Sequence, residues 1–337
     1  MTNEPRKSNT LHGEEAIIRV LAPLARGAPG AFGLEDDCAL ITPKPGTELV
    51  LKTDPVAEGV HFLADDAPED IAWKALAVNV SDLAAKAARP LGYLMALSFP
   101  EAPTADWLAR FAAGLQAAQD RFGCHLLGGD TDRRPGPLTI TISIIGEVEV
   151  GRMVRRGTAR PGEALFVSGS LGDAALGLAL RKNARLADVW GLSPAEAEHL
   201  HRRYVRPQPR LGLRPALRER ASAAMDVSDG LAKDLARMCA ASGCAVRVRL
   251  SDVPLSPAAA KVLAADPALG LRIVTGGDDY EVLATVPAAS ADGFQAMAAQ
   301  VGIAVTRIGE TQAGTGVVIE GRDGQPLTLD RTGWDHF

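Results

Sequence analysis

Five short acidic segments lie in this chain where a strand should end or a helix should begin. Apolar or small residues surround each segment, whereas a solvated charge run would have lysine and glutamate neighbours. Carboxylates in such surroundings need a compensating charge, and for oxygen ligands Mg²⁺ is the usual one. Several such ions in one site suggest a polyphosphate substrate. The segments are 34–38, 52–54, 79–82, 128–130 and 226–230.

Helices and strands alternate between these segments in the first half of the chain. The apolar spacing predicts helices over 11–24, 69–87 and 104–122 and strands over 49–53, 91–98, 124–127 and 138–150. Residues 138–150 alternate apolar and polar side chains, which is typical of a half-buried antiparallel strand. A Pro-Gly pair at 161–162 then interrupts the chain.

The second half continues in the same style. We expect helices over 172–185, 194–204, 209–220, 231–242, 256–265 and 290–301 and strands over 164–168, 224–227, 245–250, 280–286 and 305–310. Because 337 residues is long for a single core, two domains are expected. The predicted organisation is an α/β (α+β) protein of two consecutive lobes, with an N-terminal arm at 1–10 and domains at 11–155 and 156–337.

Composition narrows the class of protein. The net charge of −5 argues against nonspecific nucleic-acid binding. No stretch approaches the roughly 18 apolar residues of a membrane helix, and the polar N-terminus lacks the apolar region of a signal peptide. The four cysteines have apolar neighbours and no Cys-x-x-Cys spacing, so we expect reduced core thiols. These features predict a cytoplasmic protein.

Each acidic motif also has a structural interpretation. The pair at 36–37 could be a simple turn, and His61 a structural histidine. Ser228 or Asp229 could cap the helix that begins at 231. Capping does not explain Asp226, which lies within the preceding apolar strand.

Polar residues elsewhere offer further ligands. Asn79, Asp82 and Lys86 share one face of a predicted helix, and their short acidic and amide side chains suggest rigid ligands. The Gly-Ser-Leu-Gly stretch at 169–172 precedes a helix and could cradle a phosphate, with tight packing as the alternative. No GxxxxGK[ST] motif occurs, which excludes a Walker-type nucleotide site.

The basic residues form one dense run at 202–220. Spacing predicts Arg210, Arg214 and Arg218 on one helix face. A nucleic-acid patch would have interleaved aromatic residues, so a solvated or dimer-facing helix is favoured. The arginines at 152–156, after the long strand, are better placed to meet a phosphate.

Seven motifs follow one another along the chain: D-D-C-A, K-T-D-x-x-x-E-G-x-H-F, K-A-L-A-V-N-x-S-D-L-A-A, L-L-G-G-D-T, D-x-S-D-G-L, G-G-D-D-Y-E and W-D-H-F. In this order they resemble the thiamine-monophosphate kinase family over residues 13–337. The resemblance implies two lobes of the aminoimidazole ribonucleotide synthetase-like type, N-terminal lobes that pair in a homodimer, and ATP bound without a P-loop. The implied reaction transfers the ATP γ-phosphoryl group to thiamine monophosphate with several Mg²⁺ ions.

The resemblance also implies roles for individual residues, with no catalytic base among them. The implied Mg²⁺ ligands are Asp37, Thr53, Asp54, Asp82, Asp130, Asp226 and Asp229. The implied ATP contacts are Gly129, Asp130, Arg156 and Ser228. The implied substrate contacts are His61, Asp278 and Trp334.

The chain departs from the family pattern at a few positions, and related enzymes are alternatives. Asp278 stands where the family usually has glutamate, and Lys52 where a small polar residue is common. Selenophosphate synthetase needs an N-terminal Cys or Sec, and none precedes Cys38; the hydrogenase-maturation protein needs a C-terminal Cys, which is absent. Aminoimidazole ribonucleotide synthetase remains the best enzymatic alternative. A non-catalytic nucleotide-binding regulator is the alternative from another class.

Overall fold

The computed structural model describes residues 13–321, 324–327 and 333–334. The expected arm at 1–10 therefore lies outside the described residues. The chain divides into two compact units, one of residues 1–80 and 90–147 and one of 81–89 and 148–337. The domain boundary expected at 155 stays a prediction. Among the described residues, no helix is both long and apolar enough to cross a membrane.

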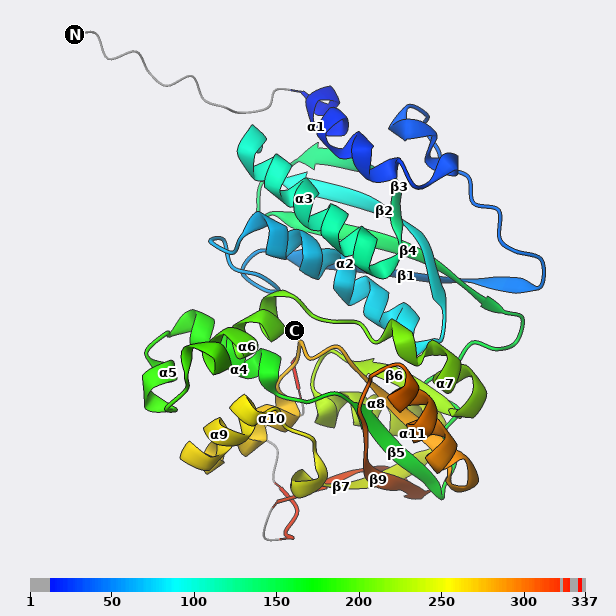
Figure 1. Cartoon of the computed structure of the whole chain (residues 1–337), viewed down its shortest axis with the longest axis vertical. Helices are drawn as coiled ribbons and strands as arrows, with labels where there is room; N and C mark the ends of the chain where they lie inside the picture. Colours follow the sequence, from blue (N-terminus) through cyan, green and yellow to red (C-terminus); the bar gives the residue numbers. More distant parts are fainter. Residues whose placement is uncertain (1–12, 322–323, 328–332, 335–337) are drawn as a thin grey trace. The chain divides into compact units, whose positions relative to one another are not determined.

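The first unit contains a four-stranded sheet whose strand order is β1-β4-β2-β3. Its strands are β1 (Thr47–Ala57), β2 (Arg89–Phe99), β3 (His125–Arg133) and β4 (Thr139–Glu149). Helices α2 (Pro68–Ala85) and α3 (Ala105–Phe122) lie on one face of the sheet, with α1 (Glu14–Leu21) beside α3 (Figure 1). Because β2 and β3 are parallel, α3 is the crossover that joins them.

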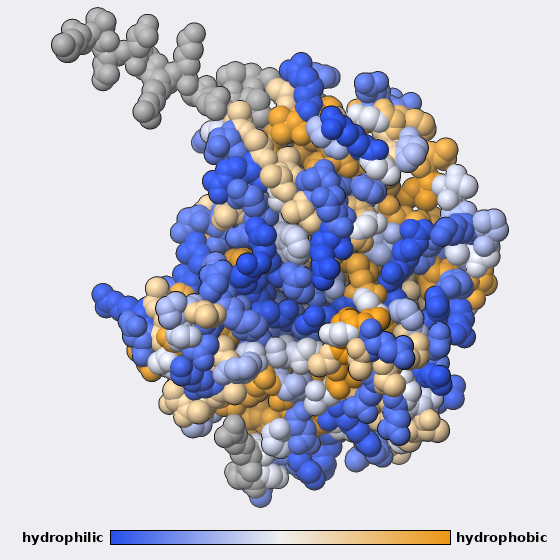
Figure 2. Space-filling model, in the orientation of Figure 1, coloured by the Kyte–Doolittle hydropathy of each residue, from blue (hydrophilic) through white to orange (hydrophobic). Residues whose placement is uncertain are grey.

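The other face of this sheet exposes apolar side chains. Leu49, Leu51 and Leu94 are 44%, 71% and 41% exposed, whereas their strand neighbours Val50 and Tyr93 are buried. Apolar surface is also visible near α1 and the segment that follows it (Figure 2). The sheet therefore buries one face under helices and leaves hydrophobic side chains on the other.

The second unit contains a six-stranded sheet of order β10-β7-β9-β5-β8-β6. Its strands are β5 (Glu163–Ser168), β6 (Ala223–Val227), β7 (Cys244–Arg249), β8 (Glu281–Pro287), β9 (Val305–Ala313) and β10 (Gly316–Glu320). Only β10 and β7 pair in parallel among the described pairs of this sheet.

Helices pack on both faces of this second sheet. Leu165 and Val167 of β5 join one apolar core with α8 (Leu231–Ser242) and α10 (Gly270–Thr275). The intervening Phe166 joins a second core with α7 (Arg214–Arg220) and α11 (Ala291–Gln300). Strand β5 is buried on both sides, which explains its continuous apolar sequence. A separate apolar cluster joins α4 (Asp173–Lys182), α6 (Pro194–Val205) and α9 (Pro257–Ala265).

Most predicted elements are confirmed to within a few residues, and α8 matches the predicted 231–242 at both ends. Three predictions were wrong. Strand β1 continues to Ala57, and β3 continues through the glycines to Arg133 because β2 supplies a parallel partner along that length. Helix α7 begins at Arg214, so Arg210 is not part of an arginine stripe. The sequence analysis also missed α10 and β10.

The four cysteines are free thiols, as expected. Three of them, Cys124, Cys239 and Cys244, are buried. The expectation of a core position was wrong for Cys38, which is exposed in the segment that precedes β1.

Candidate functional site

A pair of carboxylates in the second unit forms the most buried part of the candidate site. Asp226 lies on β6 and is 6% exposed, and Asp82 lies near the end of α2. Burial, and next the negative charge of Asp82, raises the pKa of Asp226 well above its usual range. Lys86 opposes this shift, and its Nζ donates a hydrogen bond to Ala224 O at 2.7 Å. The site therefore concentrates negative charge in a position poor in water.

Ser81 adds an oxygen to this carboxylate pair. Its side chain is fully buried, and its hydroxyl acts to lower the pKa of Asp226. Yet Ser81 Oγ forms no hydrogen bond of standard geometry within the described structure. A buried hydroxyl without a full partner is costly, so the position fits a missing ligand. No three His, Cys, Asp or Glu side chains of the described part gather closely enough to hold a metal ion by themselves.

The loop 228–230 follows Asp226 directly. The Ser228 and Asp229 N–H groups donate to Asp234 Oδ2, at 3.0 and 2.9 Å. The N-cap of α8 is Gly230, so the interpretation of Ser228 or Asp229 as an ordinary cap was wrong. Burial raises the pKa of Asp234 to about 6. Asp234 thus shapes the loop from within the helix.

Cations surround the Asp229 carboxylate. Arg237 Nη1 lies 2.5 Å and Lys233 Nζ 3.8 Å from Asp229 Oδ2. The Asp229 carbonyl oxygen accepts a hydrogen bond from Trp334 N–H at 3.0 Å, and Lys233 also donates to the Trp334 carbonyl. The indole of Trp334 is 50% exposed. The loop therefore holds an exposed aromatic side chain beside the acidic site.

The segment 276–280 lies against the same loop. Asp278 N–H donates to Ser228 O at 2.8 Å, and Tyr280 N–H donates to Val227 O at 2.8 Å. A Cβ on Gly277 would lie 2.4 Å from Ser228 O, so only glycine permits this approach. The structure thus brings Asp278 next to Ser228.

Arg156 lies on a loop pinned beside β6. Ala224 N–H donates to Arg155 O and Ser242 Oγ donates to Arg156 O, both at 3.2 Å. Arg156 is exposed. The second unit therefore has acids, a serine loop and an aromatic side chain at the C-terminal end of β6, whereas the Arg156 loop is held at the start of β6 and at the end of α8.

In the first unit, Asp54 lies in the middle of β1 rather than at its end. Its N–H donates to Asn79 Oδ1 at 3.0 Å, and Asn79 Nδ2 donates to Ala75 O. Asn79 therefore ties β1 to α2. Lys52 Nζ lies 3.0 Å from Asp54 Oδ2, so this departure from the family pattern supplies a cation to the carboxylate.

Thr53 and His61 flank Asp54. Side chains alternate along a strand, so Thr53 faces the opposite side of the sheet from Asp54, and its Oγ1 accepts a hydrogen bond from Ser143. His61 Nδ1 accepts the Ala57 N–H at 3.1 Å, which places the ring proton on Nε2 in the neutral form.

The remaining predicted site residues of this unit, Gly129, Asp130 and Asp37, lie on other segments than Asp54. Asp130 and Gly129 lie on β3, at the opposite edge of the sheet from β1, roughly 14 Å away across three strand spacings. A Cβ on Gly129 would lie 1.8 Å from Met95 O, so the close approach of β2 requires this glycine. Asp37 is exposed after a segment in which Phe32 and Leu34 have positive φ.

Sequence reasoning missed Asp234 and Arg237, which organise the 228–230 loop. Both residues lie in the first two turns of α8, and this position could have identified Asp234, because an acid in the first turn of a helix can accept hydrogen bonds from the amides of the preceding loop. Arg237 pairs with Asp234 at 3.0 Å as well as with Asp229. Both were hidden among ordinary helix-surface charges.

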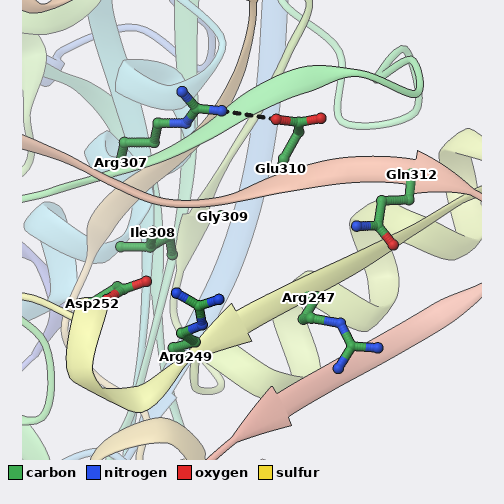
Figure 3. A pocket seen from close by; sticks show the side chains of 8 residues that line it. All are labelled: Arg247, Arg249, Asp252, Arg307, Ile308, Gly309, Glu310 and Gln312. Atoms are coloured by element: carbon green, nitrogen blue, oxygen red, sulfur yellow. Dashed lines mark hydrogen bonds and ion pairs between the residues drawn. The ribbon is translucent and has the colours of Figure 1, made fainter. Parts of the chain in front are cut away.

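A separate hollow of about 360 Å³ lies over β7 and β9, with three arginines around it (Figure 3). Arg307 pairs with Glu310 at 2.8 Å, and Glu320 pairs with Arg247 and Arg249. Asp252 adds another carboxylate to its lining. The charges balance locally, and none of the predicted site residues lines this hollow.

Comparisons with known proteins identify the fold and its relatives. Models of the AIR synthase related protein match this chain, the N-terminal domain at residues 35–148 and the C-terminal domain at 160–322. A thiamine-monophosphate kinase of Caulobacter vibrioides is 42% identical over 325 residues, covering 95% of this chain and 89% of that relative.

Solved structures agree with this assignment. A thiamine-monophosphate kinase from Stenotrophomonas maltophilia is 38% identical with a TM-score of 0.82, covering 94% of this chain and 98% of that one. AaThiL complexed with AMPPCP and TMP is 31% identical with a TM-score of 0.76, covering 96% and 97%. The predicted family and its two-lobed α/β fold are thereby confirmed. The chain belongs to the AIR synthase related family and, within it, to the thiamine-monophosphate kinases.

Proposed function

We propose that this chain transfers the γ-phosphoryl group of ATP to the phosphate of thiamine monophosphate, giving thiamine diphosphate and ADP. The observation that carries the proposal is the AaThiL complex, similar over 96% of this chain, which holds AMPPCP and TMP together. AMPPCP is an analogue of ATP, so the two ligands of that complex correspond to donor and acceptor. Relatives in the same family carry the same activity in their names.

The proposed reaction needs no side chain that acts as a general acid or a general base. The acceptor oxygen already belongs to an anionic phosphate, so no group has to remove a proton from it. Catalysis then depends on holding donor and acceptor in line and on offsetting their negative charge. An acidic site without a nucleophile or a general base suits this reaction.

The acids of the site fit Mg²⁺. The half-buried Asp82 lies close to the buried Asp226, and Ser81 supplies a buried hydroxyl oxygen beside them. Bound Mg²⁺ would neutralise charge on the phosphoryl oxygens and the carboxylates alike. Because no three His, Cys, Asp or Glu side chains converge among the residues that the structure describes, water and phosphate oxygens would complete the coordination. The remaining proposed ligands are Asp37, Thr53, Asp54, Asp130 and Asp229.

The loop 228–230 and its neighbours suit the phosphates of ATP. We assign phosphate contacts to Ser228 and Arg156 in the second unit and to Gly129 and Asp130 in the first. Arg156 is an exposed guanidinium on a pinned loop, which can form paired hydrogen bonds with phosphate oxygens.

We assign the thiamine monophosphate contacts to His61, Asp278 and Trp334. The Trp334 ring is exposed at a fixed backbone position, so it can stack on the cationic thiazolium. His61 carries its proton on Nε2 and can donate it to a phosphate oxygen. Asp278 lies beside the loop assigned to ATP, which would bring acceptor and donor together.

A homodimer formed by the first unit is part of the proposal. Leu49, Leu51 and Leu94 give the open face of its sheet the apolar character of an association surface. Because the reaction consumes ATP, we place it in the cytoplasm.

The test is product analysis of the purified protein with Mg-ATP and thiamine monophosphate. Thiamine diphosphate and ADP should form in equal amounts, and EDTA should abolish both. Plain thiamine should not react, since it lacks the acceptor phosphate. If ADP forms only with a purine-pathway substrate, the function is that of aminoimidazole ribonucleotide synthetase. Binding of ATP without any turnover would indicate a regulator instead.

A further inference from the structure

The two adjacent acids at 278–279 have different surroundings. Asp278 lies beside the Ser228 loop of the candidate site. Asp279 is buried inside the second unit, where it is 1% exposed. Asp279 Oδ2 accepts the Gly172 N–H at 2.7 Å, and Oδ1 accepts the Ala174 N–H at 3.3 Å. These amides belong to the N-terminal end of α4. The side chain of Asp279 thus occupies the amides that the sequence had suggested as a phosphate cradle.

A second set of contacts fixes the residues around Asp279. Arg203, on α6, donates from Nη2 to Asp279 O at 3.1 Å and to Glu281 Oε1 at 2.8 Å. Glu281 has no exposed surface and also accepts from Ser168 Oγ at 2.5 Å and Arg210 Nε at 2.6 Å. Arg210, expected on an exposed helix stripe, is instead part of this buried network.

The backbone on either side of Asp279 is strained. Asp278 has φ of 72° and Tyr280 has φ of 51°, a region that residues with a Cβ rarely adopt. Such conformations persist only where the surroundings impose them, and they concentrate at functional sites. The contacts of Asp279, together with those of Arg203, supply that constraint.

The strained segment connects this network to the candidate site. Asp278 and Tyr280 donate their N–H groups to Ser228 O and Val227 O, on the loop that begins at Asp226. Tyr280 Oη donates to Asp278 Oδ1 at 3.3 Å, which orients the carboxylate. A displacement of Asp279 would therefore move Asp278 relative to the phosphate-binding loop.

We infer that Asp279 is a positioning residue for the acceptor substrate: its hold on the N-terminus of α4, supported by Arg203 and Glu281, aims Asp278 at thiamine monophosphate. The inference deepens the proposed function and rests on it. The two adjacent acids thus have different roles: Asp278 faces the substrate, and Asp279 fixes the orientation of Asp278.

The test is steady-state kinetics of Asp279→Asn, with the KM of each substrate measured separately. The amide NH₂ of Asn cannot accept the hydrogen bond that one of the two amides donates. We expect the KM for thiamine monophosphate to rise roughly 10- to 100-fold, since small displacements of a binding group have effects of that size. The KM for ATP should change less than about threefold, as only the acceptor side loses its alignment.

The matched control is Ser193→Ala, which removes the capping box of α6 in the same unit but touches none of these contacts. It should lower the melting temperature and leave both KM values unchanged. If Asp279→Asn does not fold, as judged by circular dichroism, Tyr280→Phe takes its place. That variant removes the Oη hydrogen bond to Asp278 and should raise the thiamine monophosphate KM alone, by a smaller factor.

Each outcome decides the inference. An unchanged thiamine monophosphate KM in the folded variant overturns it and leaves the proposed function standing. Equal increases in both KM values also overturn it, because they indicate general loosening. Wild-type protein that does not phosphorylate thiamine monophosphate overturns the proposed function, and this inference with it.

Discussion

The acids of the two units differ in burial and in the charges that lie next to them. In the second unit Asp226 is 6% exposed, and the negative charge of Asp82 adds to the rise in its pKa. In the first unit Asp54 is partly exposed beside Lys52, and Asp130 lies on the opposite edge strand. Burying an acid beside another acid destabilises a folded chain, whereas exposed acids on separate strands cost little. We therefore expect substitution of the acids of the second unit to change the stability of the fold more than substitution of the acids of the first unit.

The largest effect should follow from Asp226→Asn. Burial opposes ionisation of Asp226, so the uncharged amide should keep the melting temperature in metal-free buffer at or above that of the wild type. Turnover should fall at least about 100-fold, because charge neutralisation at the phosphates depends on this carboxylate. Thermal unfolding and product formation measure the two effects. If the variant lost activity and also melted at a lower temperature than the wild type, Asp226 would be needed for stability, and its assignment as an acid kept for function would be contradicted.

Asp54→Asn and Asp130→Asn test the same comparison with acids of the first unit. Turnover should again be lost in both, but the melting temperature should stay close to that of the wild type because both side chains are exposed. Asp120→Asn on α3 is the control, since its exposed carboxylate accepts a hydrogen bond from Gln116 of the same helix and lies outside the candidate site. Wild-type rates of either variant in excess Mg²⁺ would rule out these two acids as ligands.

The sequence predicted single elements better than their combination. Helix α8 could be predicted end to end because its apolar spacing is regular and Gly230 and Gly243 mark its limits. Strands β1 and β3 extended beyond their apolar residues, since neighbouring strands supply backbone partners whatever the side chains are.

The same limit applies to the site. Asp82 and Asp226 are distant in sequence, and no local pattern shows that they meet. Asp278 and Asp279 look equivalent in a Gly-Gly-Asp-Asp motif, and only the tertiary contact with Gly172 separates their roles. Which acids bind Mg²⁺ stays a prediction from the family resemblance, whereas the fold shows which of them are buried.

A smaller effect is expected from Trp334→Ala. The aromatic ring is exposed and its backbone is fixed by Asp229 and Lys233, so its removal should not disturb the fold. The KM for thiamine monophosphate should rise roughly tenfold, the usual worth of one stacked cation, while the KM for ATP stays near its wild-type value. Equal changes in the two constants would mean that Trp334 only packs against the loop.

The last prediction concerns stability as a function of pH and tests the protonation state of Asp279. Burial raises the pKa of Asp279 from 3.8 to about 8, against the opposing effects of the Gly172 N–H and Arg203, while Asp173 adds to the rise. The folded protein then holds a proton that the unfolded chain releases above pH 4. Its contribution to stability is complete below pH 3.8 and is lost as the pH rises toward 8.

Denaturant unfolding between pH 5 and 8 should therefore show a free energy that falls with pH in the wild type. Asp279→Asn should reduce that slope by up to about 1.4 kcal/mol per pH unit, the limit for one proton. Ser193→Ala should keep the wild-type slope, because its capping partner Glu196 has a pKa of about 2 and stays ionised throughout this pH range. An identical slope in Asp279→Asn would mean that Asp279 is ionised in the folded protein, held as a carboxylate by the α4 amides and Arg203. Its alignment of Asp278 would then be electrostatic as well as geometric.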